Sequence, residues 1–448
     1  MTISSEVSPA VPAPAGLRRV LRFHDLALLV VGTVIGSGIF LVPAVVLKTV
    51  GNSVPLALMA WLIGGILSLL GGLTYGELAA ANPQAGGLYI YIRDSFGPLP
   101  AFLFGWVLFF VVSTGSIATL AVAFSNYLTE FLPLGFWTAK IVSVLLICLI
   151  AFVNIRGTRE SADVQNVTTI VKVLAILSMA AALLWFGSLN HSGSVVSAAS
   201  SSAHSGFSAI ALATISVLWA YEGWQYATFA AGECVNPRRD FPIAFAVGIF
   251  TLIVLYIFCN LGYLAALGTV GVASSPHVAS TAVSKALRPA LGKTVTLAIL
   301  LSIFSAANSL MLTAPRVYFA MAKDRLFFHQ LAEVHPRFGT PAVAVFATAV
   351  WASLLAASGT FEQLLTYVVF VGWSFYALAA ASIFVYRTRQ TGRQVAYRVP
   401  GYPWTPMLFI LAVAAFVLST IVAQPERAAV GLAVVFTGVP AYFIWRRR

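Results

Sequence analysis

At residues 32–40 the chain reads Gly-Thr-Val-Ile-Gly-Ser-Gly-Ile-Phe, in the middle of an apolar run from Ala27 to Val50. A second apolar run, from Phe207 to Ala231, is interrupted at residues 218–224 by Leu-Trp-Ala-Tyr-Glu-Gly-Trp. Each run is long enough to cross a bilayer. Backbone that leaves the helix at membrane depth persists only where protein or a water-filled cavity satisfies its N–H and C=O groups. Two interruptions in corresponding halves therefore predict a central binding site of the kind found in secondary transporters.

The composition is that of a membrane protein. Apolar residues make up 60% of the 448 residues, charged residues only 9%, and the mean hydropathy is +0.92. These values exclude an ordinary soluble domain. The formal charge of +12 is spread in short basic groups between apolar runs, so it indicates membrane topology and no nucleic-acid partner. The sequence contains no disulfide framework and no metal or cofactor motif, and we expect neither a cofactor nor a bound metal.

Apolar runs of suitable length predict an all-α membrane protein with twelve transmembrane helices. They cover residues 25–50, 54–80, 97–128, 135–154, 161–187, 207–232, 241–268, 291–322, 340–357, 361–386, 404–423 and 427–445. Gly and Pro punctuate several of the connections, as at Gly97-Pro98 and Asn236-Pro237.

The distribution of Lys and Arg predicts that both termini are cytoplasmic. With this orientation, nineteen of the 26 basic residues fall on the inner side. They are Arg18, Arg19, Arg22, Arg93, Arg156, Arg159, Arg238, Arg239, Arg316, Lys323, Arg325, Arg337, Arg387, Arg389, Arg393, Arg398, Arg446, Arg447 and Arg448. We expect a multi-pass protein of a bacterial cytoplasmic membrane.

The breaks also suggest how the chain is divided. Spans one to five and six to ten would each begin with a broken helix, which is the arrangement of inverted repeats. We therefore expect repeats at 24–187 and 207–386, joined by an outer linker at 188–206. A disordered cytoplasmic tail at 1–23 would precede them, and a cytoplasmic loop at 387–403 and the last two spans, within 404–448, would follow.

The first break combines groups that suit an α-amino acid. At Gly36-Ser37-Gly38 the missing side chains would let a ligand approach the backbone, and the following half-helix presents unpaired N–H groups to an anion. The Ser37 hydroxyl adds a donor. Carbonyls near Val34, Trp219 and Glu222 would lack intrahelical partners and suit an ammonium group. The alternative is that the glycines form only a helix-packing surface.

Lys172 is unusual because it lies in the middle of the fifth span. A lysine there costs about 2.5–3.5 kcal/mol on insertion scales and commonly marks a function. Its helical neighbours include no carboxylate one turn away. Ser302, Ser305 and Ser309 share one face of the eighth span and are candidate partners, unless they serve only helix packing.

The chain resembles the amino acid–polyamine–organocation superfamily, and within it the L-type amino acid transporter branch. The resemblance covers spans one to ten. It rests on GTVIGSGIFLVP (32–43), YGELAAANPQAGGLYIYIRDSFG (75–97), NVTTIVKVL (166–174), LWAYEGWQYATFAAGECVNP (218–237) and APRVYFAMAKDRLFF (314–328). These stretches stand in the family's order and spacing.

The resemblance implies a five-plus-five core, two peripheral helices and alternating access without ATP. It implies a substrate site at Val34, Ile35, Gly36, Ser37 and Gly38, with Trp219, Ala220, Tyr221 and Glu222 on the second break. Trp219 would cover the substrate as a gate. Lys172, with Gly32, Ser302 and Ser305, would take the place of a bound cation.

Glu222 is a departure from many L-type relatives, which have Gly at this position. Its carboxylate could bind a cationic side chain, carry a proton or act as a structural partner, and we favour the last two. Glu77 and Glu233, near inner helix ends, are better explained as partners of loop arginines.

The sequence therefore predicts a sodium-independent transporter of neutral L-amino acids, working by exchange or proton coupling. The alternatives are a cationic amino acid or polyamine transporter that uses Glu222, and an amino acid sensor on the same fold. An enzyme is disfavoured because no HExxH motif occurs and the histidines are scattered. The spans are too uniformly apolar for a channel. We expect an amino acid substrate and a lipid bilayer as partners, with no obligate protein partner.

Overall fold

The computed structural model describes residues 17–190, 206–275, 277–287, 291–359, 361–389, 396–423 and 425–446. Most of the expected disordered tail, most of the outer linker and part of the loop at 387–403 lie outside the described residues. Within them the regular structure is helical, apart from an isolated bridge between Leu21 and Cys234.

The first half of the chain forms eight α-helices and a short π-helical segment. They are α1 (Phe23–Val34), α2 (Gly38–Thr49), α3 (Val54–Ala81), α4 (Leu88–Phe96), α5 (Pro98–Val107), η1 (Leu108–Val112), α6 (Ser113–Leu128), α7 (Phe136–Arg156) and α8 (Thr158–Asn190). The interruption in the first apolar run is confirmed, because α1 and α2 are bent by 50° at a break between them.

The second half begins with α9 and continues into a 3₁₀ segment, η2, instead of a second α-helix. Its elements are α9 (Gly206–Ala220), η2 (Trp224–Glu233), α10 (Pro237–Ser274), α11 (Val278–Ala286), α12 (Gly292–Thr313), α13 (Pro315–Lys323), η4 (His329–Ala332), α14 (Ala342–Ser358), α15 (Phe361–Arg389), α16 (Trp404–Ala423) and α17 (Pro425–Arg446).

This is a multi-pass membrane protein. Among the described residues, eight helical spans are long and apolar enough to cross a bilayer, and the bent pair α1 and α2 makes a ninth. The predicted number of twelve is larger, partly because α9 and α14 have only 15 and 17 residues. Each predicted span nevertheless overlaps one of these helices or a broken pair.

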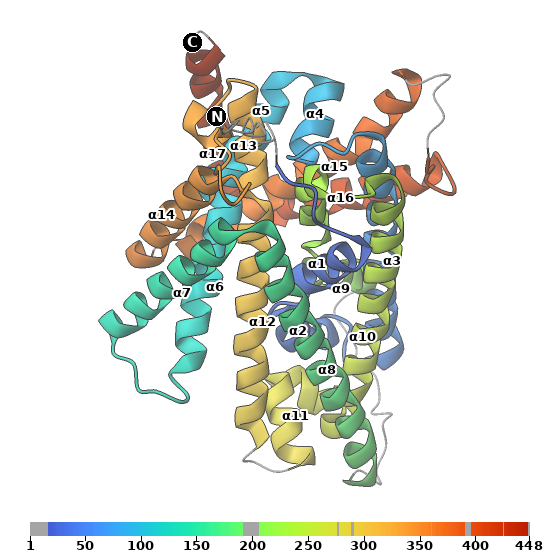
Figure 1. Ribbon diagram of the computed structural model, residues 1–448. Helices are drawn as coiled ribbons and strands as arrows, with labels where there is room; N and C mark the ends of the chain where they lie inside the picture. The colour runs from blue at the N-terminus through green and yellow to red at the C-terminus, as the bar shows by residue number, and fades with distance from the viewer. Residues whose placement is uncertain are drawn as a thin grey trace, which may run out of the picture.

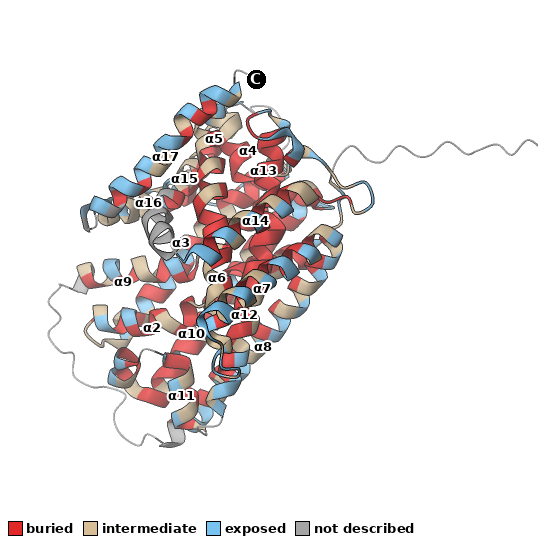
Figure 2. Cartoon of the chain, turned by 90° about the vertical axis from the view of Figure 1, so that its left-hand side faces the viewer, coloured by how far each residue is buried: buried red, intermediate tan, exposed pale blue. Residues whose placement is uncertain are grey.

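The broken helices lie inside the bundle. Figure 1 shows α1, α2 and α9 in the middle of the molecule, and α1 packs against α8, α10 and α12 while α2 and α9 pack against each other. Buried residues concentrate in this interior, and exposed residues follow the outer sides of helices such as α7, α8 and α17 (Figure 2). The interior therefore holds polar backbone where the bundle shields it from lipid.

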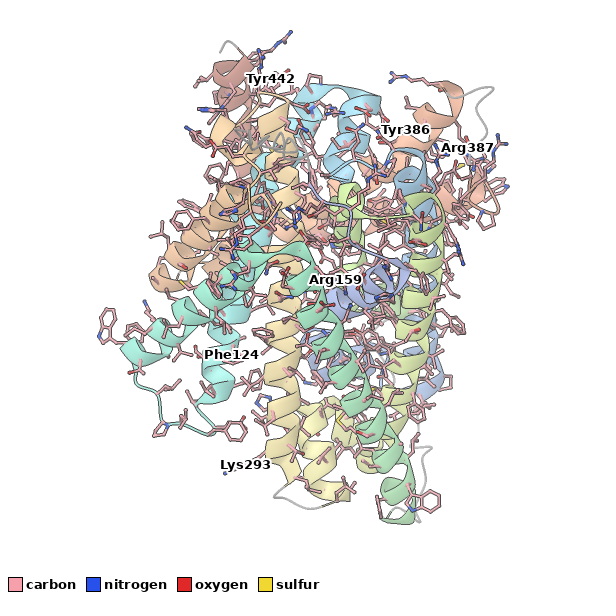
Figure 3. All side chains as sticks on the ribbon, viewed as in Figure 1. Phe124, Arg159, Lys293, Tyr386, Arg387 and Tyr442 are labelled. Carbon is pink, nitrogen blue, oxygen red and sulfur yellow. The ribbon has the colours of Figure 1, made fainter. Side chains whose placement is uncertain are left out.

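Ion pairs join the helices at one end of the molecule. Glu77 accepts two hydrogen bonds from Arg387, at 2.8 and 2.7 Å, and Glu233 accepts two from the fully buried Arg316, at 2.7 and 3.0 Å. Both acids are paired with arginines as predicted, but these arginines belong to α13 and α15 and not to loops. Arg387 and Lys293 lie at opposite ends of the bundle (Figure 3), and the prediction places them on opposite sides of the membrane.

Candidate substrate site between the two helix breaks

The first break exposes the amino end of α2. Past the end of α1, the Gly36 N–H donates a hydrogen bond to the Val34 carbonyl at 2.8 Å. The N–H groups of Ser37, Gly38 and Ile39 find no acceptor in the part of the chain that the structure describes. The Ser37 side chain makes no capping hydrogen bond either. Three unpaired donors and the positive end of the helix dipole make this point favourable for an anion.

The second break is a tight turn that needs glycine. The Glu222 N–H donates to the Trp219 carbonyl at 3.2 Å, and Gly223 follows with a φ of 128°. A Cβ at Gly223 would lie 2.9 Å from the Thr33 carbonyl oxygen. The left-handed conformation and the close approach to α1 both exclude a side chain here.

The glycines of the first break serve two different purposes. A Cβ added at Gly36 meets no atom within 4 Å, whereas one at Gly38 would lie 2.9 Å from the Ala220 Cα. The sequence led us to expect that both glycines make room for a ligand. Gly38 instead lets α2 pack directly on the end of α9, and only Gly36 leaves open space.

A cavity of about 180 Å³ lies between the two breaks. It is lined by the break residues Thr33, Val34, Gly36, Ser37, Gly38, Trp219, Ala220, Glu222 and Gly223, and by Val112, Ser116, Thr119, Leu120, Tyr226, Ala306 and Leu310. The volume is below the range of about 300–1,000 Å³ typical of drug-sized ligands, and it suits a small solute. Trp219 is 45% exposed at this cavity; its role as a gate stays a prediction.

Two of the predicted substrate-binding residues do not line the cavity. Ile35 is fully buried and contributes its carbonyl to the Lys172 contacts described below. Tyr221 is also fully buried and packs its ring against Trp61 and Tyr256, with ring centroids 6.1 and 4.9 Å apart. One residue of each break therefore faces the protein interior while its neighbours line the cavity.

Tyr256 of α10 bridges the two breaks, a role that no local sequence signal predicts. Its hydroxyl lies 3.1 Å from the Ala220 carbonyl and 3.3 Å from the Val34 carbonyl. We had expected the carbonyls near Val34 and Trp219 to be unpaired. The Val34 carbonyl instead has two donors, the Gly36 N–H and the Tyr256 hydroxyl, and the Trp219 carbonyl accepts the Glu222 N–H. A carbonyl has two lone pairs, so the Trp219 carbonyl can still accept another donor. The Glu222 carbonyl accepts no hydrogen bond from the described residues.

Lys172 holds the carboxyl end of α1. Its side chain is fully buried, and Nζ donates to the carbonyls of Gly32, at 2.5 Å, and Ile35, at 2.9 Å. The Ser302 hydroxyl of α12 donates to the same Ile35 carbonyl at 2.9 Å. A positive charge at this point satisfies carbonyls that the end of a helix leaves unpaired and complements the helix dipole.

The other predicted partners of Lys172 bond elsewhere. Ser305 accepts a hydrogen bond from Gln165 at 3.1 Å, and Ser309 donates to the Ser305 carbonyl at 3.0 Å. Gly32 packs so closely on Gln165 and Thr169 that a Cβ would overlap both side chains. The contacts of Lys172 are therefore with backbone, and Ser302 is linked to it only through the shared Ile35 carbonyl.

Glu222 is the acidic residue that lines the cavity. Its Oε1 accepts a hydrogen bond from the Tyr376 hydroxyl of α15 at 3.1 Å, and the Tyr376 carbonyl in turn accepts one from Tyr75 at 2.7 Å. The carboxylate is thus partnered by a side chain and not by freed backbone N–H groups. Among the described residues no cluster of three or more His, Cys, Asp or Glu side chains could hold a metal.

Comparison with known proteins identifies the family. The family model described as amino acid permease matches residues 21–442. The chain belongs to the amino acid permease family. It is 33% identical to the serine/threonine exchanger SteT of Bacillus subtilis (strain 168), over 97% of this chain and 98% of that protein.

Mammalian members of the family also match over most of their length. The large neutral amino acids transporter small subunit 2 of Mus musculus is 29% identical, over 98% of this chain and 84% of the mouse protein. The b(0,+)-type amino acid transporter 1 of Mus musculus is 31% identical, over 89% of this chain and 81% of its own length. These likenesses and the broken helices agree on an amino acid transporter.

Proposed function

We propose that the protein is a sodium-independent transporter of neutral L-amino acids, working by alternating access in a bacterial cytoplasmic membrane. It would have twelve spans, both termini inside, and inverted repeats at 24–187 and 207–386. Exchange is favoured over proton coupling because the Bacillus subtilis relative is named an exchanger. The names of that relative and of the mouse large neutral amino acids transporter support neutral substrates.

One observation carries this proposal. The N–H groups at the start of α2 and the Glu222 carbonyl have no hydrogen-bond partner in the described part of the chain, and they belong to two breaks that line the same cavity. Hydrogen-bond donors suit a carboxylate and acceptors suit an ammonium group. Every α-amino acid carries both a carboxylate and an ammonium group. Gly36 leaves the space through which a carboxylate would reach the α2 donors.

Sodium independence rests on Lys172. Its ammonium group contacts carbonyl oxygens at the end of α1, which are the ligands a bound cation would need. A positive charge already fills that position, so a sodium ion there would meet like-charge repulsion.

A cationic amino acid or polyamine is the alternative substrate, and the carboxylate of Glu222 at the cavity is the observation in its favour. Its bond to Tyr376 supports a structural role instead. The mouse large neutral amino acids transporter is named a small subunit, whereas we propose that this chain, like a single-chain exchanger, acts without an obligate partner.

Uptake into proteoliposomes that contain only this purified chain tests the proposal. We expect uptake of labelled neutral amino acid when the vesicles are preloaded with amino acid, at equal rates in choline and sodium buffers. Unlabelled serine, threonine, alanine and leucine should compete more strongly than arginine, lysine or putrescine. A sodium requirement would remove the assigned role of Lys172. Preferential competition by cations would favour the Glu222 alternative, and binding without flux would identify a sensor.

A further inference from the structure

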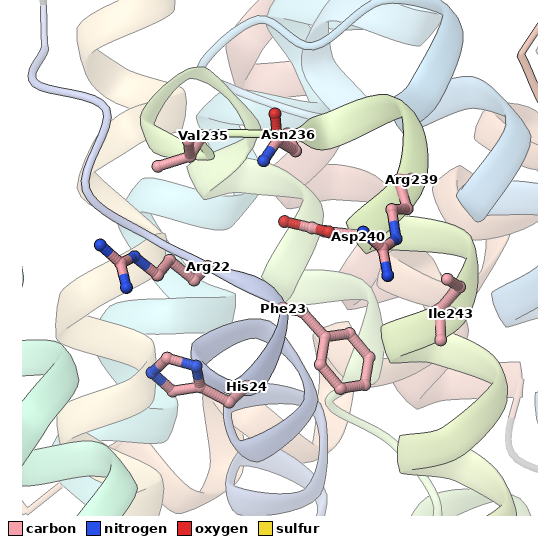
Figure 4. A pocket seen from close by; sticks show the side chains of 8 residues that line it. All are labelled: Arg22, Phe23, His24, Val235, Asn236, Arg239, Asp240 and Ile243. Atoms are coloured by element: carbon pink, nitrogen blue, oxygen red, sulfur yellow. The ribbon is translucent and has the colours of Figure 1, made fainter.

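A second pocket, of about 510 Å³, opens between the starts of α1 and α10. Figure 4 shows the residues that line it, namely Arg22, Phe23, His24, Val235, Asn236, Arg239, Asp240 and Ile243. It shares no lining residue with the cavity between the breaks. The basic residues around it belong to the group predicted to be cytoplasmic, so the pocket would lie at the inner edge of the bilayer.

Asp240 is the acidic residue of this pocket. Its side chain extends from α10 toward the start of α1 (Figure 4), and the residue is only 6% exposed. The other buried acids, Asp25, Glu77 and Glu233, are each paired with an arginine. Asp240 has no ion pair and no side-chain hydrogen bond among the described residues. Its carboxylate lines the open pocket, so a cationic group bound there would gain a charge-assisted hydrogen bond to it.

Arg22 and Arg239 provide the opposite charge. Arg22 stands on the α1 side of the opening and Arg239 on the α10 side, and both residues are exposed. Neither guanidinium forms an ion pair in the described part of the chain, whereas His24 lies 3.2 Å from Asp25. The α10 amino end adds a favourable dipole for an anion. Guanidinium groups bind phosphate well because their planar donors match its oxygens.

Apolar side chains continue from the pocket along the outer face of α10. Phe23, Val235 and Ile243 line the pocket and are 37%, 40% and 40% exposed. Below them Val247, Phe250 and Val254 are 46%, 61% and 50% exposed, at spacings that keep them on one side of the helix. In a bilayer such a stripe contacts acyl chains, so the pocket stands where the headgroup of a lipid on this stripe would lie.

We propose that this pocket binds the headgroup of a phosphatidylethanolamine molecule from the inner leaflet. The ammonium group pairs with Asp240, and the phosphate pairs with Arg239 beside it at the amino end of α10, with Arg22 adding positive charge on the α1 side of the opening. The acyl chains follow the exposed stripe of α10. A free amino acid carries similar charges but makes no use of the stripe, and an anionic lipid without an amine leaves Asp240 unpaired. Basic pockets at the cytoplasmic ends of helices are established lipid-binding features.

Lipid titration of the purified full-length protein, followed by native mass spectrometry, tests this proposal. Phosphatidylethanolamine, phosphatidylcholine and phosphatidylglycerol with identical acyl chains are compared. We expect phosphatidylethanolamine to bind at least about tenfold more tightly than the other two. Asp240→Asn should abolish this preference and leave phosphatidylglycerol binding unchanged or stronger. Arg239→Gln should weaken both lipids several-fold.

Glu333→Gln and Arg238→Gln are the matched controls, because each removes a like charge from an exposed residue that does not line the pocket. Both should bind lipid as the wild type does. Equal binding of the three lipids, or an unchanged preference in Asp240→Asn, would overturn the proposal. Displacement of the bound lipid by a neutral amino acid at millimolar concentration would overturn the proposal as well. Arg239 is exposed, so Arg239→Gln should fold and tests the proposal even if Asp240→Asn does not fold. Unchanged lipid binding by Arg239→Gln would also overturn the proposal.

Discussion

The two helix breaks differ in what they offer a ligand. The first joins two α-helices and leaves donors free, because α2 starts anew with three N–H groups that have no acceptor among the described residues. The second joins α9 to a 3₁₀ segment, and several backbone N–H and C=O groups of its turn are hydrogen-bonded to each other. It contributes instead a carboxylate, a carbonyl and an exposed tryptophan to the cavity.

The breaks also differ in how they are held. Lys172 and Ser302, from two long helices, fix the end of α1 through three hydrogen bonds to backbone carbonyls. The second break is held by the Tyr256 hydroxyl at Ala220 and by the Tyr376 hydroxyl at Glu222. A charged donor makes stronger hydrogen bonds than a neutral hydroxyl. We therefore expect the first break to be the more rigid anchor and the second to move more when substrate binds.

Removal of the charge at the first break should have the largest effect. In Lys172→Ala the carbonyls of Gly32 and Ile35 lose their charged donor, and hydrogen bonds to charged groups contribute about 1.5–3 kcal/mol each. We expect transport in proteoliposomes to fall to less than about a tenth of the wild-type rate. Lys293→Ala, at an exposed position far from the site, should transport normally. Activity above half of wild type in Lys172→Ala would show that the lysine is not an anchor.

Substitutions of the two glycines separate ligand space from packing. Gly38→Val should lower both substrate binding and the melting temperature, because its side chain collides with Ala220. Gly36→Val should abolish binding with little change in melting temperature, because its side chain enters open space. Ligand binding and thermal unfolding of the same preparations provide the measurement. A large loss of stability in Gly36→Val would mean that this glycine too serves packing.

The contrast between these glycines marks the limit of what could be predicted from the sequence. The breaks themselves could be predicted, because glycines and a charged residue inside apolar runs are local signals. Lys172 could be singled out for the same reason, and the family resemblance supplied its position at the end of α1. Whether a glycine faces a ligand or another helix depends on packing between segments that are about 180 residues apart, and no local signal reports it.

Tyr256 and Tyr376 were missed for a related reason. A tyrosine in an apolar helix is a common packing residue, and its hydroxyl partners, at Ala220 and Glu222, belong to a distant part of the sequence. Asp240 escaped notice because an acid in the first turn of a helix is usual. Its low exposure and its lack of a side-chain partner among the described residues became visible only in the folded chain.

Tyr256→Phe tests whether the two breaks are mechanically linked. It removes neutral hydrogen bonds to the Val34 and Ala220 carbonyls, which together contribute about 1–2 kcal/mol. We expect a loss of roughly 5- to 30-fold in transport efficiency. Tyr263→Phe is the matched control, because this buried tyrosine lies on the same helix and its hydroxyl has no hydrogen-bond partner among the residues that the structure describes. Equal effects in the two variants would contradict the bridging role.

Ser37→Ala should have the smallest effect. The variant removes one hydroxyl donor but leaves the three N–H groups of the α2 amino end in place. One hydrogen bond to a charged carboxylate contributes about 1.5 kcal/mol at the lower limit. Substrate affinity should therefore fall roughly tenfold, as measured by equilibrium binding of labelled amino acid. A complete loss of binding would mean that the hydroxyl, and not the backbone, is the main anchor.

Competition by amino alcohols tests most directly the central claim that the amino end of α2 binds the substrate carboxylate. An amino alcohol keeps the ammonium group and side chain of a transported amino acid but replaces the carboxylate by a neutral group. Because several charge-assisted hydrogen bonds would be lost, we predict that it competes at least about 100-fold more weakly than the parent amino acid. If the two compete equally well, the free N–H groups of Ser37, Gly38 and Ile39 are not the carboxylate site.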